Sequence, residues 1–296
     1  MVESEKKQQS HDRQKSDFLS SSRIAIFGLG LMGGSLAMAL RGKCKKIYAY
    51  DPNLETLDAM INKKLADHVS ANPDDMLHNS DLVILAAPVL SIIKLIKQMP
   101  EIHNGCAVIL DIGSTKKGIV DAFETLPPRF DPIGGHPICG KDKSSIVYAE
   151  SNLYLNAPFC LTKMERTSVK ASHLAEELVV RIGAIPVWVE ADVHDKLIAS
   201  TSHLPYLTAI TLALSTPPES TILIGPGFRD TGRLAGSDIN MMMDILVTNR
   251  TNILETMDQY GNHFQKIKVI LEKEDYSELR KIITAAAQTF TEMKKR

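Results

Sequence analysis

The chain has 296 residues, enough for two domains, and 44% of them are hydrophobic and 23% charged, as in soluble globular proteins. The net charge of -1 argues against a nucleic-acid-binding protein, and four scattered cysteines argue against a disulfide scaffold or a zinc site. No apolar run is expected to reach the roughly 20 residues of a bilayer span, so neither a membrane nor a nucleic acid is an expected partner.

The first 22 residues form a segment with few apolar side chains. It holds four Lys or Arg and four Asp or Glu residues, so its net charge is zero. Such a segment does not bury enough apolar surface to offset the entropy lost on ordering, which predicts a disordered tail over residues 1–22. It lacks the apolar stretch of a secretory signal, and its acidic residues are atypical of a transit peptide, so we expect a cytoplasmic protein.

Short β-rich runs alternate with helical segments in the first half of the chain. The expected strands are 23–27, 47–50, 82–86, 107–110, 130–133, 159–161 and 186–189. Helices are expected up to Arg41, over 53–64 and 89–99, and around 174–181. Strands that alternate with helices are typical of a doubly wound sheet. The sequence therefore predicts a Rossmann-type α/β domain with a mostly parallel sheet over residues 23–189.

A glycine-rich turn follows the first expected strand and opens the first helix. Gly28, Gly30 and Gly33 form the pattern GxGxxG. Gly28 permits a tight turn, Gly30 lets a pyrophosphate approach the backbone, and Gly33 lets the helix pack closely on the strand. The free N–H groups at the helix N-terminus favour phosphate binding. Further contacts to the cofactor are predicted from the same turn and from the segment after the strand 82–86, at Leu31, Met32, Ala87 and Pro88.

Asp51 ends the second expected strand, 18 positions after Gly33. This is close to the spacing of the acidic residue that hydrogen-bonds the ribose hydroxyls of NAD in Rossmann domains. A carboxylate at this position repels a 2′-phosphate, and residues 52–61 contain no Arg or Lys that would receive one. The sequence therefore predicts NAD as the cofactor, with NADP less favoured.

Long helical segments make up the second half, over 192–214, 240–263 and 274–295. Pro205 is expected to interrupt the first of them. This segment carries an apolar run that is unusual for an exposed helix, at Leu204, Leu207, Ile210, Leu212 and Leu214. We expect this run to be buried within the domain or against another chain. The prediction is an all-α domain over residues 190–296 that forms a homodimer.

Two expected loops at the carboxyl ends of strands carry candidate catalytic residues, at 111–116 and 134–140. His136 lies between two glycines and a proline, which fixes a titratable ring on an irregular backbone. An imidazole suits removal of a hydroxyl proton as hydride leaves the same carbon. Ser114 is expected to hydrogen-bond that imidazole or the nicotinamide, or to cap a helix that begins near Thr115. No metal-ligand spacing is present.

Three motifs resemble those of the prephenate/arogenate dehydrogenase family. They are Gly-Gly-His-Pro at 134–137, Ser-His-Leu-Pro at 202–205 and Gly-Phe-Arg-Asp-Thr-Gly-Arg at 227–233. The resemblance implies NAD(P)-dependent oxidative decarboxylation, either of prephenate to 4-hydroxyphenylpyruvate or of arogenate to tyrosine. It also implies a helical dimerisation domain similar to the C-terminal domain of 6-phosphogluconate dehydrogenase.

The resemblance implies a role for three residues, His136, Ser114 and Arg233. His136 would polarise or deprotonate the substrate 4-hydroxyl while hydride passes from C4 to the nicotinamide. Ser114 would orient His136 and contact the cofactor. Arg233 occupies the position of the substrate-binding arginine, and its planar guanidinium suits a carboxylate. Arg229 lies four positions earlier, where it would share a helix face or form a surface ion pair.

Two positions depart from the family pattern on the expected substrate side. Tyr206 replaces a second histidine, and Asp142 replaces a glutamate six positions after His136. Both are expected to contact substrate, and both leave the choice between prephenate and arogenate open. His203 is expected either to pack its helix or to support the active site, and His194 is expected to be solvated or to cap a helix.

Two other functions remain compatible with the sequence. One is another hydroxyacid dehydrogenase, although those enzymes generally use a lysine base on a helix. The other is a non-catalytic NAD-binding regulator, which would need no combination of His136, Ser114 and Arg233.

Overall fold

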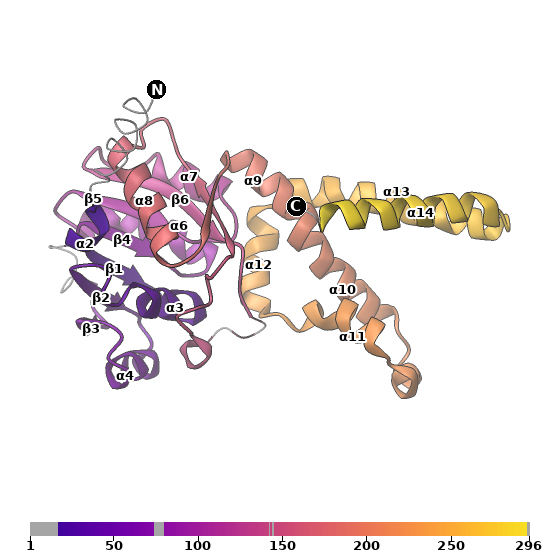
Figure 1. Cartoon of the computed structure of the whole chain (residues 1–296), viewed down its shortest axis with the longest axis horizontal. Helices are drawn as coiled ribbons and strands as arrows, with labels where there is room; N and C mark the ends of the chain where they lie inside the picture. The colour runs from indigo at the N-terminus through magenta and orange to yellow at the C-terminus, as the bar shows by residue number, and fades with distance from the viewer. Residues whose placement is uncertain (1–16, 74–79, 142, 144, 295–296) are drawn as a thin grey trace, which may run out of the picture.

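The computed structural model describes residues 17–73, 80–141, 143 and 145–294 of the chain (Figure 1). Residues 1–16 of the expected tail lie outside this part. For residues 17–22 the predicted disorder is wrong, because Phe18–Ser21 forms a short helix, α2. Its first two N–H groups donate to the carboxylate of Glu177, and Leu19 is fully buried. Burial of this leucine against α8 (Val169–Arg181) explains why the segment is ordered.

One eight-stranded sheet organises the first part of the chain, in the order β3-β2-β1-β4-β5-β6-β7-β8. All neighbouring pairs are parallel except β6 and β7. The predicted Rossmann-type, mostly parallel sheet is confirmed. The strands are β1 (Arg23–Phe27), β2 (Lys46–Tyr50), β3 (His68–Ser70), β4 (Leu82–Leu85), β5 (Ala107–Asp111), β6 (Phe130–Pro137), β7 (Pro158–Thr162) and β8 (Ile185–Trp188).

Helices cover both faces of this sheet and create two apolar cores. On β1, Ile24 and Ile26 belong to one core, whereas Ala25 and Phe27 belong to the other. This division follows from the alternation of side chains along a strand. The helices are α3 (Leu31–Leu40), α4 (Leu54–Asn62), α6 (Val89–Ile102), α7 (Lys117–Phe123) and α8, with the 3-10 turn η1 (Ile146–Tyr148).

Strand β6 changes its partner halfway along. Residues 130–133 pair in parallel with β5, and residues 134–137 pair antiparallel with β7. The segment that begins at Gly134, expected to be a loop, is therefore strand as far as Pro137. The two glycines allow this close approach, because a Cβ on Gly135 would lie 2.6 Å from the carbonyl oxygen of Asp111. His136 is consequently held on a strand opposite Cys160.

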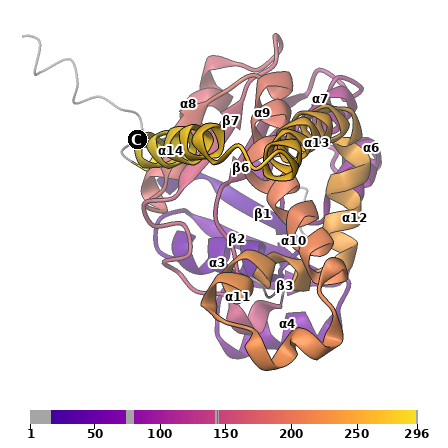
Figure 2. The ribbon, with the colours of Figure 1, turned by 90° about the vertical axis from the view of Figure 1, so that its right-hand side faces the viewer.

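The second part is entirely helical and lies beside the carboxyl edge of the sheet (Figure 2). The expected interruption at Pro205 is a π-helical turn, η2, immediately before it. The single helix expected over 240–263 is two helices that meet at Asn249. The elements are α9 (Ala191–Ile198), η2 (Ala199–His203), α10 (Leu204–Ser215), η3 (Pro218–Leu223), α11 (Pro226–Gly232), η4 (Arg233–Gly236), α12 (Ile239–Thr248), α13 (Arg250–Glu272) and α14 (Tyr276–Met293).

Much apolar surface of the helical part is exposed in the single chain. Helices α13 and α14 extend side by side away from the sheet (Figure 1). On the apolar run of α10, Leu214 is 84% exposed, and Ile222 in the following η3 is 88% exposed. Exposed aromatic rings also occur on α13 and α14, at Phe264 and Phe290.

The run Ala191–Ser215 is long and apolar enough to cross a membrane by length and composition, contrary to the sequence expectation. A core helix of a folded protein meets the same criterion, so this is weak evidence for a membrane span. In the fold, the run carries three buried polar side chains, His194, Asp195 and His203.

Candidate active site

The turn between β1 and α3 has the geometry that its glycines predict. Gly28 has φ +89°, and a Cβ at this position would lie 2.5 Å from the carbonyl oxygen of Ala86. A Cβ on Gly33 would overlap the carbonyl oxygen of Gly28. Helix α3 begins after Gly30 with no side-chain cap, so no capping side chain satisfies the N–H groups at its N-terminus. This geometry fits a dinucleotide pyrophosphate.

Asp51 lies beside the glycine turn, at the carboxyl end of β2. One of its carboxylate oxygens accepts a hydrogen bond from Leu29 N at 2.7 Å, and the other accepts one from Asn53 N at 2.9 Å. These two bonds fix the orientation of the carboxylate while each oxygen keeps a further lone pair. Such a fixed acceptor fits a ribose diol, so the residues present fit NAD.

The remaining predicted cofactor contacts lie at the ends of neighbouring elements. Leu31 and Met32 begin α3, and the Met32 carbonyl accepts a hydrogen bond from the Tyr154 hydroxyl. Ala87 and Pro88 lie between β4 and α6, next to the Ala86 carbonyl that approaches Gly28.

His136 is part of a chain of three side chains that reaches into the helical part. Its Nδ1 lies 2.9 Å from Nε2 of His194, and Nδ1 of His194 lies 2.8 Å from Oδ1 of Asp195. His136 is partly buried, whereas His194 is only 3% exposed. The expectation that His194 is solvated or caps a helix is therefore wrong. It faces inward from the first turn of α9, where the helix packs on the sheet domain.

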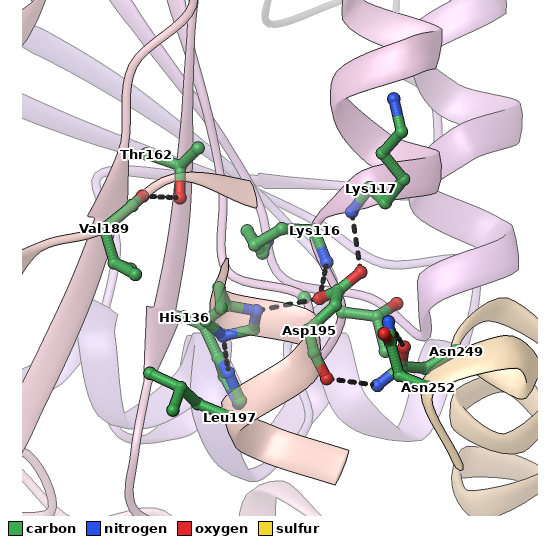
Figure 3. Close-up of polar contacts among 12 residues, drawn as sticks. Lys116, Lys117, His136, Thr162, Val189, Asp195, Leu197, Asn249 and Asn252 are labelled. Carbon is green, nitrogen blue, oxygen red and sulfur yellow. Dashed lines mark hydrogen bonds and ion pairs between the residues drawn. The ribbon is translucent and has the colours of Figure 1, made fainter. Parts of the chain in front are cut away.

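The carboxylate of Asp195 also caps α7 from outside that helix (Figure 3). Its two oxygens accept hydrogen bonds from Lys116 N at 2.7 Å and Lys117 N at 2.9 Å. Helix α7 begins at Lys117 with Lys116 as its N-cap, so Ser114 does not cap it as one alternative expected. Ser114 lies three residues after the end of β5, in the loop that leads to this helix.

A buried ion pair joins this loop to the end of β5, the neighbour of the strand that carries His136. The Lys116 ammonium contacts the Asp111 carboxylate, and both side chains are 0% exposed. The same carboxylate accepts hydrogen bonds from Gly113 N at 2.8 Å and Gly135 N at 3.2 Å. Asp111 and Lys116 thereby fix the loop against β6 at the residue before His136.

These surroundings keep His136 neutral. Desolvation lowers the pKa of its imidazole well below the usual value, and the nearby His194, Lys116 and His203 lower it further. Burial alone would raise the pKa of Asp195, but hydrogen bonds from His194 and from the Lys117 and Lys116 N–H groups outweigh it and lower the pKa. At neutral pH, the neutral imidazole of His136 is thus linked through His194 to the carboxylate of Asp195.

His203 is buried beside this chain. The side-chain amide of Asn249 donates to the Asp195 carbonyl at 2.7 Å and contacts Nδ1 of His203 at 3.2 Å (Figure 3 labels Asn249). Burial lowers the pKa of His203 to about 4, although Asp195 acts in the opposite direction. His203 is therefore neutral, and its burial and its contact with Asn249 fit helix packing, one of the two roles that the sequence left open; support of the active site stays a prediction.

The residues expected to bind substrate occupy different places. Tyr206 is buried among Met242 and Ile245 in the helical part. Arg233 is exposed at the start of η4, which packs on α10, and Arg229 is exposed on α11. The remaining substrate-side prediction, Asp142, lies outside the described residues.

Sequence reasoning missed four residues of this site: Asp111, Lys116, Asp195 and Asn249. Asp111 and Lys116 stand in the loop that was singled out for Ser114, but nothing local shows that they pair. Helix α9 also carries Asp192, His194 and Lys196, so no signal in its sequence singled out Asp195. Within the described ranges 17–73, 80–141, 143 and 145–294, no three His, Cys, Asp or Glu side chains are placed to hold a metal ion.

A dinucleotide-binding sheet, joined to a helical part by a histidine at its carboxyl edge, defines a dehydrogenase of the nicotinamide-nucleotide class. Two family models match the chain. The nucleotide-binding domain of prephenate dehydrogenase matches residues 36–187, and its dimerization domain matches residues 190–285. The chain belongs to the prephenate dehydrogenase family.

Individual relatives agree with this assignment. Prephenate dehydrogenase of Bacillus subtilis is 31% identical over 86% of this chain and 72% of its own length. Cyclohexadienyl dehydrogenase of Zymomonas mobilis is 27% identical over 85% of this chain and 89% of its own length. The crystal structure of prephenate dehydrogenase from A. aeolicus, in complex with hydroxyphenyl propionate and NAD+, superimposes with a TM-score of 0.85 at 30% identity. That match covers 93% of this chain and 99% of the other.

Proposed function

We propose that the chain catalyses the NAD-dependent oxidative decarboxylation of prephenate to 4-hydroxyphenylpyruvate. The observation that carries this proposal is the neutral His136, held at the carboxyl edge of a sheet whose first turn fits NAD. Bound NAD supplies the hydride acceptor. The match to prephenate dehydrogenases over most of the chain supports the choice of substrate.

His136 acts as the base for the substrate 4-hydroxyl. As hydride leaves C4, the hydroxyl proton moves to the imidazole and C4 becomes a ketone carbon. The bond from the ring to its carboxylate then breaks, and its electron pair makes the ring aromatic as CO2 leaves. The oxygen at C4 becomes phenolic and takes the proton back, so the reaction releases no net proton. The base must therefore both accept and return one proton.

Four other side chains are assigned to the substrate and the cofactor. Arg233 offers a guanidinium for a substrate carboxylate, because the dianionic substrate needs a cation. Ser114 in the β5–α7 loop contacts His136 and the nicotinamide. Tyr206 is assigned to the side-chain end of the substrate, and Asp142 is assigned there from its sequence position alone, six residues after His136.

Arogenate is the second candidate substrate, used alone or together with prephenate. Tyr206 replaces a histidine of the family pattern and is buried among apolar side chains, so the site has no second imidazole at this position. The relative from Zymomonas mobilis is named a cyclohexadienyl dehydrogenase.

We also propose that the chain works as a cytoplasmic homodimer formed through residues 190–296. The exposed apolar side chains of α10, η3, α13 and α14 support this, and so does the family description of this region as a dimerization domain. Light scattering at micromolar concentration is expected to give twice the chain mass of 32.6 kDa. A monomer at that concentration would contradict the proposal.

The activity is tested by incubating the purified chain with NAD and either prephenate or arogenate while NADH absorbance is followed. We expect turnover with prephenate. In His136→Asn, kcat is expected to collapse while calorimetry still detects binding of both ligands. In Arg233→Ala, the KM for prephenate is expected to rise with little change in NAD affinity. No turnover of either substrate by the wild-type chain would overturn the proposed function.

A further inference from the structure

We propose that His194 and Asp195 form a proton relay behind His136, in which His194 holds a proton passed on by His136 between the oxidation and decarboxylation steps. The inference rests on the proposed function, which makes His136 the base. It assigns a task to two buried side chains that the reaction, as described above, does not use.

The geometry fixes which nitrogen carries each proton. A carboxylate only accepts hydrogen bonds, so Nδ1 of His194 must donate to Asp195 across the 2.8 Å contact. In neutral His194, Nε2 is then an acceptor. Nδ1 of His136, at 2.9 Å, must donate to it. This leaves Nε2 of His136 without a proton, in the form that accepts one from the substrate.

Charge in the site favours a cation on His194 over one on His136. The Lys116 ammonium acts against a positive His136, and so does the desolvation of its ring. His194 directly contacts the Asp195 carboxylate, and the third imidazole, His203, is held neutral by burial. Of the two histidines joined by this hydrogen bond, only His194 contacts a carboxylate, and a nearby opposite charge stabilises a cation.

The relay conserves protons and charge. Nε2 of His136 takes the hydroxyl proton of the substrate, and Nδ1 of His136 passes its own proton to Nε2 of His194. His194 becomes an imidazolium paired with Asp195, and His136 is neutral again. The N–H now on Nε2 of His136 donates to the ketone oxygen, which stabilises the negative charge that develops there as CO2 leaves. Both protons then return, and the phenol is formed.

Asp195 cannot serve as the test residue, because its carboxylate also caps α7. His194→Gln is the informative change. The glutamine carbonyl reaches the position of Nε2 and accepts a hydrogen bond from His136, but it does not bind a proton at neutral pH. A purely orienting role would survive this change, whereas a relay would not. His173 on α8 is exposed and distant from the chain of three, so His173→Gln is the matched control.

We expect His194→Gln to lower kcat by about 100-fold, within the range of general acid–base effects. The KM values for prephenate and NAD should stay within about threefold of wild type, and His173→Gln should match wild type. Nitrogen-15 NMR of the wild type should show Nδ1 of His136 protonated and Nε2 bare, and His194→Gln should keep this tautomer.

Two results would overturn the relay: a kcat within about threefold of wild type in His194→Gln, or a protonated Nε2 of His136 in the resting enzyme. The NMR result does not depend on turnover. A wild-type chain that turns over neither substrate refutes the proposed function instead, so the two failures are distinguishable.

Discussion

Replacing Lys116 with methionine tests whether the buried ion pair holds the loop between β5 and α7 in place. Both Lys116 and Asp111 are 0% exposed, so the change leaves a carboxylate in the protein interior without its counter-charge. Breaking a buried pair in this way costs roughly 3–5 kcal/mol, because the remaining charge is neither solvated nor paired. For a chain of this size, the expected fall in melting temperature is about 10 °C.

The neighbouring lysine provides the control. Lys117 forms an ion pair with Asp121 at 2.7 Å, but its side chain is 53% exposed. An exposed pair contributes about 0.5 kcal/mol, so Lys117→Met should melt within about 2 °C of wild type. Thermal unfolding of the three proteins is followed by circular dichroism at pH 7 and one fixed protein concentration. If Lys116→Met and Lys117→Met lose equal stability, the buried pair does not stabilise the loop.

The stability of Lys116→Met should also depend on pH in a defined direction. Burial raises the pKa of Asp111, and loss of the lysine removes the attraction that opposes this effect. The folded variant then holds a proton that the unfolded chain releases above about pH 4. Its stability relative to wild type should therefore fall as pH rises from about 4 towards 7. Adding Asp111→Asn to Lys116→Met should restore at least half of the stability that Lys116→Met loses at pH 7.

Three further changes test other parts of the molecule. Gly33→Ala should weaken NAD binding at least about tenfold by calorimetry, since the added Cβ overlaps the Gly28 carbonyl; unchanged affinity would contradict the assigned phosphate site. Asp51→Ser should shift the ratio of kcat/KM values towards NADP, and an unchanged ratio would show that Asp51 does not select the cofactor. His203 is neutral when folded down to about pH 4, while the unfolded residue binds a proton below about pH 6.5. The wild-type free energy of unfolding, measured with urea, should therefore fall as pH is lowered from about 6.5 to about 4. His203→Asn should reduce this fall by up to roughly 3 kcal/mol.

The features that the sequence predicts correctly depend on residues that are close together in the chain. The glycine turn needs Gly28 and Gly33 for steric reasons, and both occur within one six-residue pattern. The buried strands of a parallel sheet are continuous apolar runs, so seven of the eight described strands were located from the sequence. The exception, β3, has three residues and no such run. His136 was found because its backbone neighbours are unusual for a structural histidine.

The features that could not be predicted depend on contacts between distant segments. His136 and His194 are 58 positions apart, and Asp195 and Lys116 are 79 apart. The break between α12 and α13 at Asn249 also coincides with long-range contacts. The side-chain amide of Asn249 donates to the Asp195 carbonyl and contacts Nδ1 of His203. Apolar periodicity continues through this position, so the pattern alone predicted one helix where tertiary hydrogen bonds produce two.

These long-range contacts converge on one side chain that links the two parts of the enzyme. Asp195 belongs to the helical part, yet its carboxylate binds the first N–H groups of α7 in the sheet domain and the imidazole that faces His136. A shift of about 1 Å between the two parts would stretch hydrogen bonds of 2.7–2.9 Å beyond their normal range. Such a shift would break the cap of α7, next to the loop that carries Ser114, and it would also remove the hydrogen bonds that fix the tautomer of His136. The packing of the helical part would therefore help to set the tautomer of His136, the proposed base, and the proposed dimer would stabilise the same arrangement.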